Sequence, residues 1–139
     1  MVVSAKSVTQ EDLLGCGIAC VAFICNVSYR TAKKQYFRNL GDANKTGYLC
    51  KDLVKALSKA DKQYSYKHLK KKIRFKTNTI VFLGRSKKYP VGHYLVRTNV
   101  GWMDPWIDFD VDEADIKKAN SGFRIRLPEK PIYVIFPLS

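Results

Sequence analysis

Residues 10–20 read QEDLLGCGIAC, and they open the most apolar run of the chain. From Gly15 to Cys25 the residues are apolar nearly all round, which for a helix means burial on most of its sides. We therefore predict a central helix there, with Cys16 in its first turn, where unpaired backbone N–H groups favour a thiolate. Gly15 and Gly17 are expected to leave room for a substrate beside the sulfur. The alternative is a buried cysteine that packs as a small hydrophobe.

Helices are expected first and strands afterwards. Two amphipathic helices are predicted, over 28–37 with Ser28 as cap and over 46–60 with Thr46 as cap. After Asp61, β-branched and aromatic runs predict an antiparallel sheet, interrupted by a short helix at 111–119 capped by Asp112. The predicted strands are 79–84, 92–98, 123–127 and 132–136. This order predicts one α+β domain over 1–139, with N-terminal helices packed on a C-terminal antiparallel sheet.

The chain is strongly basic, with 25 Lys and Arg against 12 Asp and Glu and a net charge of +13. The charge gathers in RTAKKQYFR, KHLKKKIRFK and GRSKKY, which are interleaved with aromatic residues. Such patches are typical of surfaces that bind RNA or an acidic protein, but they also occur as faces that only solvate a domain. No apolar run is long enough to span a membrane, and no secretory signal is predicted. We expect a cytoplasmic chain, or else the delivered domain of a larger secreted protein.

Four cysteines are too few for a secreted disulfide scaffold, so reduced thiols are expected. No C-x-x-C pair occurs and the two histidines are distant in sequence, which disfavours a zinc site. Packing is the expected role of Cys20, Cys25 and Cys50.

A reactive cysteine needs a base, and two histidines are available. His68 lies in a ten-residue stretch with six Lys or Arg, and we interpret it as a surface residue. His93 follows a glycine at the start of a strand and is the better candidate. If strands 91–98 and 101–107 are joined by an even-length loop, residue 97 lies opposite 102, and His93 and Asp104 share one face as near neighbours. An odd-length loop would separate them, and Asp104 is then only part of an Asp-Pro turn.

Gln10 precedes Cys16 by six residues. Its amide N–H groups can reach the point served by the backbone N–H of Cys16 and so complete an oxyanion hole, although most such glutamines are surface residues. Trp102 and Trp106 flank Asp104 and either line a substrate groove or pack in the core.

The chain resembles the papain-like cysteine peptidase superfamily in four features: Gln10, the CGIAC run that opens an apolar helix, and the later GHYLV and DP. The resemblance is closest to the bacteriocin-processing (double-glycine leader) peptidases, which occur at the N-terminus of peptide-exporting ABC transporters and as freestanding domains. It covers residues 10–105. Two positions depart from the family, which often has an acid directly before the nucleophile and a proline after the next glycine, where this chain has Gly15 and Ile18.

The resemblance implies a papain-like fold built around a nucleophile helix. It implies that Cys16 is the nucleophile, His93 the general base and acid, Asp104 the residue that orients His93, and Gln10 the oxyanion residue. The implied reaction cleaves a peptide or protein substrate through an acyl-enzyme, without a metal or a cofactor. The alternative function is a papain-like toxin or effector domain whose basic surface binds or cleaves RNA, or engages an acidic immunity-type protein.

Overall fold

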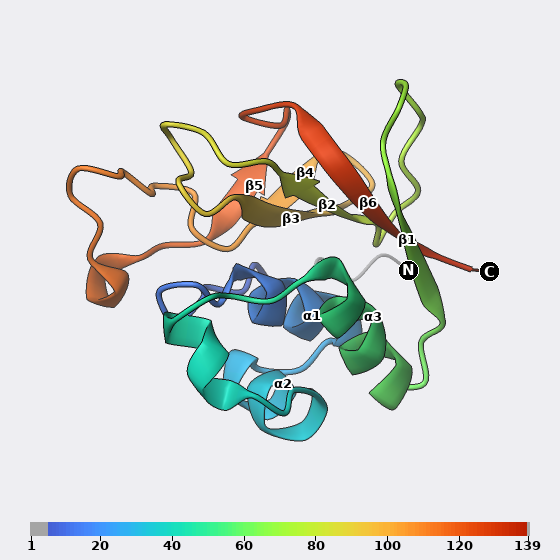
Figure 1. Ribbon diagram of the computed structural model, residues 1–139, viewed down its shortest axis with the longest axis horizontal. Helices are drawn as coiled ribbons and strands as arrows, with labels where there is room; N and C mark the ends of the chain where they lie inside the picture. The colour runs from blue at the N-terminus through green and yellow to red at the C-terminus, as the bar shows by residue number, and fades with distance from the viewer. Residues whose placement is uncertain (1–5, 139) are drawn as a thin grey trace.

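The computed structural model describes residues 6–138, in which three α-helices lie on one side of a six-stranded sheet (Figure 1). The α-helices are α1 (Cys16–Cys25), α2 (Tyr29–Tyr36) and α3 (Cys50–Lys59), and two 3-10 helices cover Leu40–Asn44 and Ile116–Lys118. The strands are β1 (Tyr64–His68), β2 (Ile80–Leu83), β3 (His93–Arg97), β4 (Trp102–Asp104), β5 (Gly122–Arg124) and β6 (Pro131–Pro137). Their order is β1-β6-β2-β3-β4-β5, and every neighbouring pair is antiparallel. The predicted α+β arrangement is confirmed.

The first two helices form where the sequence predicts them. Helix α1 begins at Cys16, directly after Gly15, and α2 begins after its predicted cap, Ser28, whose side chain accepts the backbone N–H of Thr31. Within residues 6–138, no helix is both long and apolar enough to cross a membrane. Residues 1–5 and residue 139 lie outside the described part of the chain. The prediction that the N-terminus lacks a secretory signal, and the two ends of the predicted domain 1–139, therefore fall partly on residues that are not described.

Two predicted helix starts are wrong. The third helix begins at Cys50 rather than near Thr46, because Gly47 takes a positive φ of 73° and a right-handed helix cannot run through it. Its first turn is fastened instead by Asp52, whose carboxylate accepts the backbone N–H of Leu49 at 2.8 Å.

The helix predicted over 111–119 is also wrong. This segment consists of turns that end in the three-residue 3-10 helix Ile116–Lys118. Asp115 caps it by accepting the backbone N–H of Lys117, whereas the expected cap, Asp112, lies in the turns before it. The segment is exposed on nearly all sides, so it has no apolar face to bury, and a longer helix gains nothing from packing there.

The hairpin that carries the predicted histidine has the even-length loop. Arg97 lies opposite Trp102 and Val96 opposite Met103, and the backbone N–H of Thr98 donates to Gly101. The strand β1 was not predicted, since four of its five residues are at least partly exposed and its sequence, YSYKH, has only two apolar residues, Tyr64 and Tyr66. It forms the edge of the sheet by pairing with β6.

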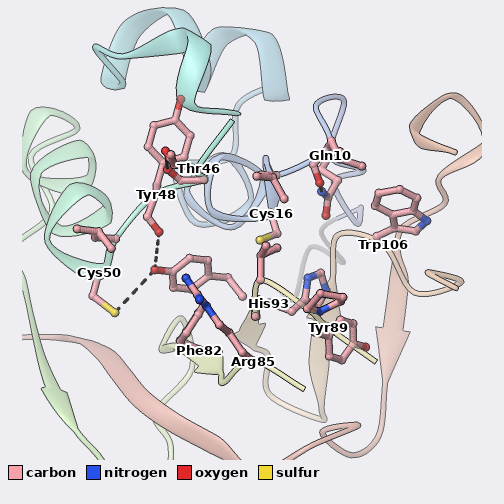
Figure 2. A pocket seen from close by; sticks show the side chains of 18 of the residues that line it. Gln10, Cys16, Thr46, Tyr48, Cys50, Phe82, Arg85, Tyr89, His93 and Trp106 are labelled. Atoms are coloured by element: carbon pink, nitrogen blue, oxygen red, sulfur yellow. Dashed lines mark hydrogen bonds between the residues drawn. The ribbon is translucent and has the colours of Figure 1, made fainter. Parts of the chain in front are cut away.

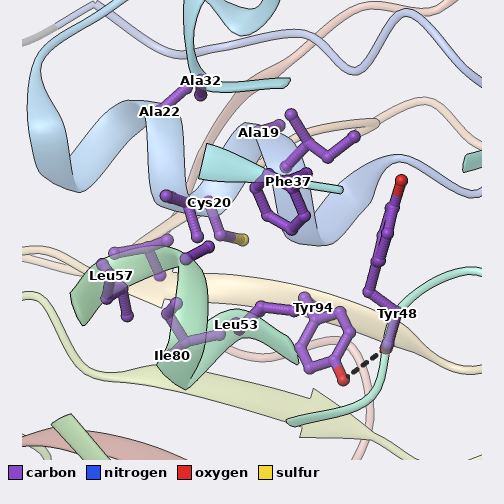
Figure 3. Close-up of a cluster of buried hydrophobic side chains, with 14 of the residues drawn as sticks. Ala19, Cys20, Ala22, Ala32, Phe37, Tyr48, Leu53, Leu57, Ile80 and Tyr94 are labelled. Carbon is purple, nitrogen blue, oxygen red and sulfur yellow. Dashed lines mark hydrogen bonds between the residues drawn. The ribbon is translucent and has the colours of Figure 1, made fainter. Parts of the chain in front are cut away.

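The main core fills the space between the helices and the sheet (Figure 3). Cys20 is fully buried there among apolar residues, in agreement with its predicted packing role. Gly17 also serves packing: a Cβ at this position would lie 2.9 Å from a methyl group of Leu53, so the glycine lets α1 approach α3 closely. The expectation that Gly17 makes room for a substrate is therefore wrong. A second cluster covers the other face of the sheet and includes Trp102, against which Phe75 packs at 5.3 Å.

Candidate active site

Cys16 is the first residue of α1 and is partly exposed, so its sulfur lies at the positive end of the helix dipole and within reach of a ligand. Gly15 precedes it, and a Cβ there would lie 2.0 Å from the hydroxyl oxygen of Tyr29. The expectation that Gly15 makes room for a substrate is wrong, because the space beside it is occupied by the side chain of Tyr29.

The loop that leads into α1 is held by the carboxylate of Asp12. Its Oδ2 accepts hydrogen bonds from the Tyr29 hydroxyl and from Lys33, both at 2.7 Å, and its Oδ1 accepts one from Asn44 at 3.1 Å. Burial alone would raise the pKa of Asp12, but the bonds from Lys33 and Tyr29 lower it below the ordinary value. The backbone before Cys16 is therefore tied to α2 and to the following 3-10 helix through one ionised carboxylate.

His93 and Asp104 form a direct, buried pair. His93 is 5 % exposed and Asp104 is fully buried, and the imidazole Nε2 lies 2.6 Å from Oδ1 of Asp104. Because Nε2 is bound to the carboxylate, Nδ1 is the ring nitrogen that remains for Cys16. The even-length hairpin loop accounts for this meeting, since it places both side chains on one face of β3 and β4.

The charges of this pair stabilise one another. Burial alone would lower the pKa of His93, but hydrogen bonds with Asp104 and Cys16 raise it to about 9. Burial alone would raise the pKa of Asp104, but hydrogen bonds from His93, from Arg124 and from the backbone N–H of Trp106 lower it to about 2. An imidazolium beside an aspartate is thus the favoured form at neutral pH.

Arg124 and Tyr89 also belong to this group, and neither was predicted as a site residue. Arg124, in β5, donates from Nε to Oδ2 of Asp104 at 2.7 Å. Tyr89 lies in the loop before β3, and its ring is stacked on the imidazole of His93. No local motif marks either residue, because both reach the site through strand pairing or loop geometry.

Gln10 lies beside Cys16, and Figure 2 shows both residues at the wall of one cavity. Its side chain is buried, and Nε2 donates to the backbone oxygens of Asp12 and Leu13, each at 3.1 Å. Its Oε1 is buried and makes no hydrogen bond with the part of the chain that the structure describes. Both N–H groups of the amide thus hold the loop before the cysteine, so donation to an oxyanion requires one of these bonds to be exchanged.

The cavity has a volume of about 640 Å³ and also exposes His93 and Trp106. Trp106 therefore lines the cavity, whereas Trp102 belongs to the core on the far face of the sheet. The wall is largely apolar or aromatic and carries two exposed cations, Lys51 and Arg85. No Asp or Glu is among the described residues that line it. This combination fits a ligand with apolar groups and negative charge.

The other candidate residues differ from Cys16 in their surroundings. Burial raises the pKa of Cys20, Cys25 and Cys50, most strongly that of Cys20. Cys50 lines the cavity as well, where its sulfur accepts a hydrogen bond from the hydroxyl of Tyr94. His68 is exposed on β1, as predicted.

Comparison with family models matches residues 4–124 to the Peptidase C39 family. The chain belongs to this family. Peptidase C39 is a papain-like cysteine peptidase family that includes bacteriocin-processing peptidases, so the resemblance read from the sequence is confirmed, together with the papain-like fold class. The C39 chain is accordingly a cysteine peptidase-like hydrolase. Comparisons with curated proteins and with solved structures gave no match.

Proposed function

We propose that this C39 protein cleaves a peptide bond, with Cys16 as nucleophile, His93 as general base and acid, and Asp104 as the residue that orients His93. One observation carries the proposal: the first residue of α1 is a partly exposed cysteine in the same cavity as a histidine whose other ring nitrogen is bound to a buried aspartate at 2.6 Å. This is the arrangement that a thiolate–imidazolium pair requires.

The reaction follows from these positions. The Cys16 thiolate attacks the carbonyl carbon of the scissile bond, a C–S bond forms, and the negative charge moves to the carbonyl oxygen. The backbone N–H of Cys16, and Gln10 after it exchanges one of its loop bonds, are the proposed donors to that oxygen. When the C–N bond breaks, the amine leaves with the proton of His93. His93 then takes a proton from water, whose oxygen attacks the thioester carbon. The C–S bond breaks, its electron pair returns to Cys16 as the thiolate, and the acid product leaves.

The cavity wall supports a peptide that carries acidic as well as apolar side chains. Residues 62–103, which include the wall from Phe82 to Tyr94, contain eleven Lys or Arg and no Asp or Glu. Among the ion pairs of residues 6–138, neither Lys51 nor Arg85 takes part. An acidic side chain of a bound peptide would therefore meet cations that no carboxylate of the protein already neutralises.

The decisive experiment measures alkylation of each cysteine by iodoacetamide against pH, by mass spectrometry, in the wild type and in His93→Ala. We expect Cys16 to react at neutral pH while Cys20, Cys25 and Cys50 stay unmodified, and the His93 variant to lose this selectivity. His68→Ala is the matched control and should behave as the wild type. Equal reactivity of all four thiols, indifferent to His93, would overturn the proposal.

A peptide library then identifies the substrate. Cys16→Ala should abolish cleavage and leave the fold unchanged, since the side chain is small and partly exposed. Tight binding of RNA that falls steeply with salt and survives Cys16→Ala, without cleavage of any peptide, would instead favour the RNA-binding alternative.

A further inference from the structure

Arg124 reaches the buried carboxylate from the side opposite the histidine. Its side chain is 21 % exposed, Nε donates to Oδ2 of Asp104 at 2.7 Å, and Nη2 donates to the backbone oxygen of Ile107 at 3.0 Å. The second bond fixes the plane of the guanidinium group. Arg124 is thus attached at two points and presents one N–H to Asp104 in a defined direction.

The strand register explains why Asp104 has a partner on each side. Asp104 lies opposite Gly122, and Arg124 lies opposite Trp102, so Arg124 is the diagonal neighbour of Asp104 across β4 and β5. The pairing of β3 with β4, continued by one residue, places His93 diagonally on the other side. One carboxylate therefore bridges three adjacent strands.

The two oxygens of Asp104 have separate tasks. Oδ1 accepts hydrogen bonds from the imidazole Nε2 of His93 and from the backbone N–H of Trp106, whereas among residues 6–138 Oδ2 accepts only from Arg124. Asp104 is fully buried, so no bulk water can replace a missing donor. Without Arg124, Oδ2 would be a charged, buried oxygen with no hydrogen bond.

We propose that Arg124 is a positioning residue of this site: it holds the carboxylate of Asp104 through Oδ2 and, together with His93, balances the negative charge of that carboxylate. This inference rests on the proposed function of Cys16, His93 and Asp104.

The charge balance gives Arg124 its effect. The groups that face the pair are the thiols of Cys16 and Cys20 from α1, the hydroxyl-bearing ring of Tyr89 from the loop before β3, and Arg124 from β5. With Cys16 as a thiolate and His93 as an imidazolium, Asp104 and Arg124 complete a set of two negative and two positive charges. Removal of Arg124 leaves a net negative charge in a buried site, so His93 would hold its proton more tightly and give it up more slowly.

Arg124→Gln tests this directly, because glutamine retains a donor and removes the charge. We expect the pKa of His93, followed by ¹⁵N NMR, to rise by about one unit or more. The basic limb of the pH–rate profile should move by the same amount, and kcat should fall about tenfold while KM stays within about twofold. Arg124→Lys retains the charge and should titrate as the wild type does. Arg126→Gln is the matched control, since Arg126 is exposed two residues along the chain and forms no ion pair among the described residues.

A His93 pKa in Arg124→Gln that equals or falls below the wild-type value would overturn the proposal, since a purely structural role changes stability without this shift. Arg124→Met, with an apolar side chain of similar length, repeats the titration if the glutamine variant does not fold. The NMR titration needs no substrate. Failure of the peptidase hypothesis would appear in Cys16 alkylation and peptide cleavage, whereas failure of the Arg124 hypothesis would appear in the titration of His93.

Discussion

The ring of Tyr89 is stacked on the imidazole of His93, with the ring centroids 4.7 Å apart and the planes inclined by 8°. Tyr89 is itself 2 % exposed and is stacked in turn against Phe109. Its buried ring therefore covers one face of the imidazole and keeps water from that face of the pair with Asp104. A hydrogen bond between charged groups is stronger when water is excluded.

Tyr89→Leu should weaken the bond between His93 and Asp104, because it admits water to the pair. We expect the pKa of His93 to fall from about 9 towards its ordinary value of 6.5. Tyr89→Phe is the control, since it keeps the stacked ring and removes only a buried hydroxyl that has no hydrogen-bond partner within residues 6–138. The phenylalanine variant should titrate as the wild type does, and a ¹⁵N NMR titration of His93 in both variants distinguishes the two results.

Asp104 should make the stability of the fold depend on pH in the acid range. Its pKa is lowered from 3.8 to about 2, so its contribution is fully present above 3.8 and is lost as the pH falls through about 2. At about 1.4 kcal/mol per unit, the loss in the free energy of unfolding is about 2 kcal/mol. Urea unfolding of the wild type and of Asp104→Asn between these pH values checks this, and the asparagine variant should lack that part of the pH dependence. Parallel curves for the two proteins would contradict it.

Gln10→Ala separates two roles of the glutamine. If Gln10 donates to the oxyanion, kcat should fall about a hundredfold or more with KM little changed. If its two bonds to the backbone oxygens of Asp12 and Leu13 are its whole contribution, the variant should lose thermal stability, with a loss of activity no larger than the unfolded fraction explains. Asn44→Ala, which also loosens this loop, provides the comparison.

Charge reversal at the cavity wall should change peptide preference. Arg85→Glu or Lys51→Glu is expected to reduce kcat/KM for an acidic peptide about three- to tenfold and to leave a neutral peptide of the same length unaffected. Lys59→Glu makes the same change outside the cavity, on the same helix as Lys51. The difference in kcat/KM between these variants and the wild type should become smaller as the salt concentration rises, because salt screens the charges. An equal effect of all three variants would assign the change to net charge alone.

The positions of Cys16, His93 and Asp104 could be predicted from the sequence because each depends on residues that lie close to it in the chain. An apolar run that starts after a glycine fixes the first turn of α1, and an even-length hairpin loop fixes which side chains share a face. The chemical roles of these residues, like that of Gln10, stay predictions. The part that Arg124 and Tyr89 play in the site could not be predicted from the sequence. Arg124 reaches the site through the pairing of β5 with β4, and Tyr89 through the path of the loop before β3.

Helix starts were the least predictable part of the fold. Thr46 and Asp112 are good capping residues by type, but a cap acts only where the following turn becomes helical. The positive φ of Gly47 prevents this after Thr46, and the exposed turns around Asp112 bury no apolar face. After Thr46 the backbone of Gly47 prevents the helix, and Asp52 then fastens the first turn of α3 by accepting the backbone N–H of Leu49. In the second segment Asp115, and not Asp112, caps the short 3-10 helix.

Gly15→Ala should be destabilising, because the new methyl group would lie 2.0 Å from the hydroxyl oxygen of Tyr29. Overpacking of this kind costs about 1–3 kcal/mol. In Tyr29→Phe the hydroxyl is absent, so the double variant Gly15→Ala/Tyr29→Phe should be more stable than the sum of the two single losses predicts. Urea unfolding of the four proteins measures this coupling, and strict additivity would contradict it.

The contact between Gly15 and Tyr29 also restricts which residues homologues can have at these two positions. An acid directly before the cysteine, as many members of the family have, does not fit beneath a tyrosine at position 29. Here the negative charge near the loop is supplied by Asp12, bound by that tyrosine. Residues 15 and 29 are therefore expected to covary among close homologues, since a larger residue at 15 requires a smaller one at 29, and a smaller residue at 29 no longer binds Asp12.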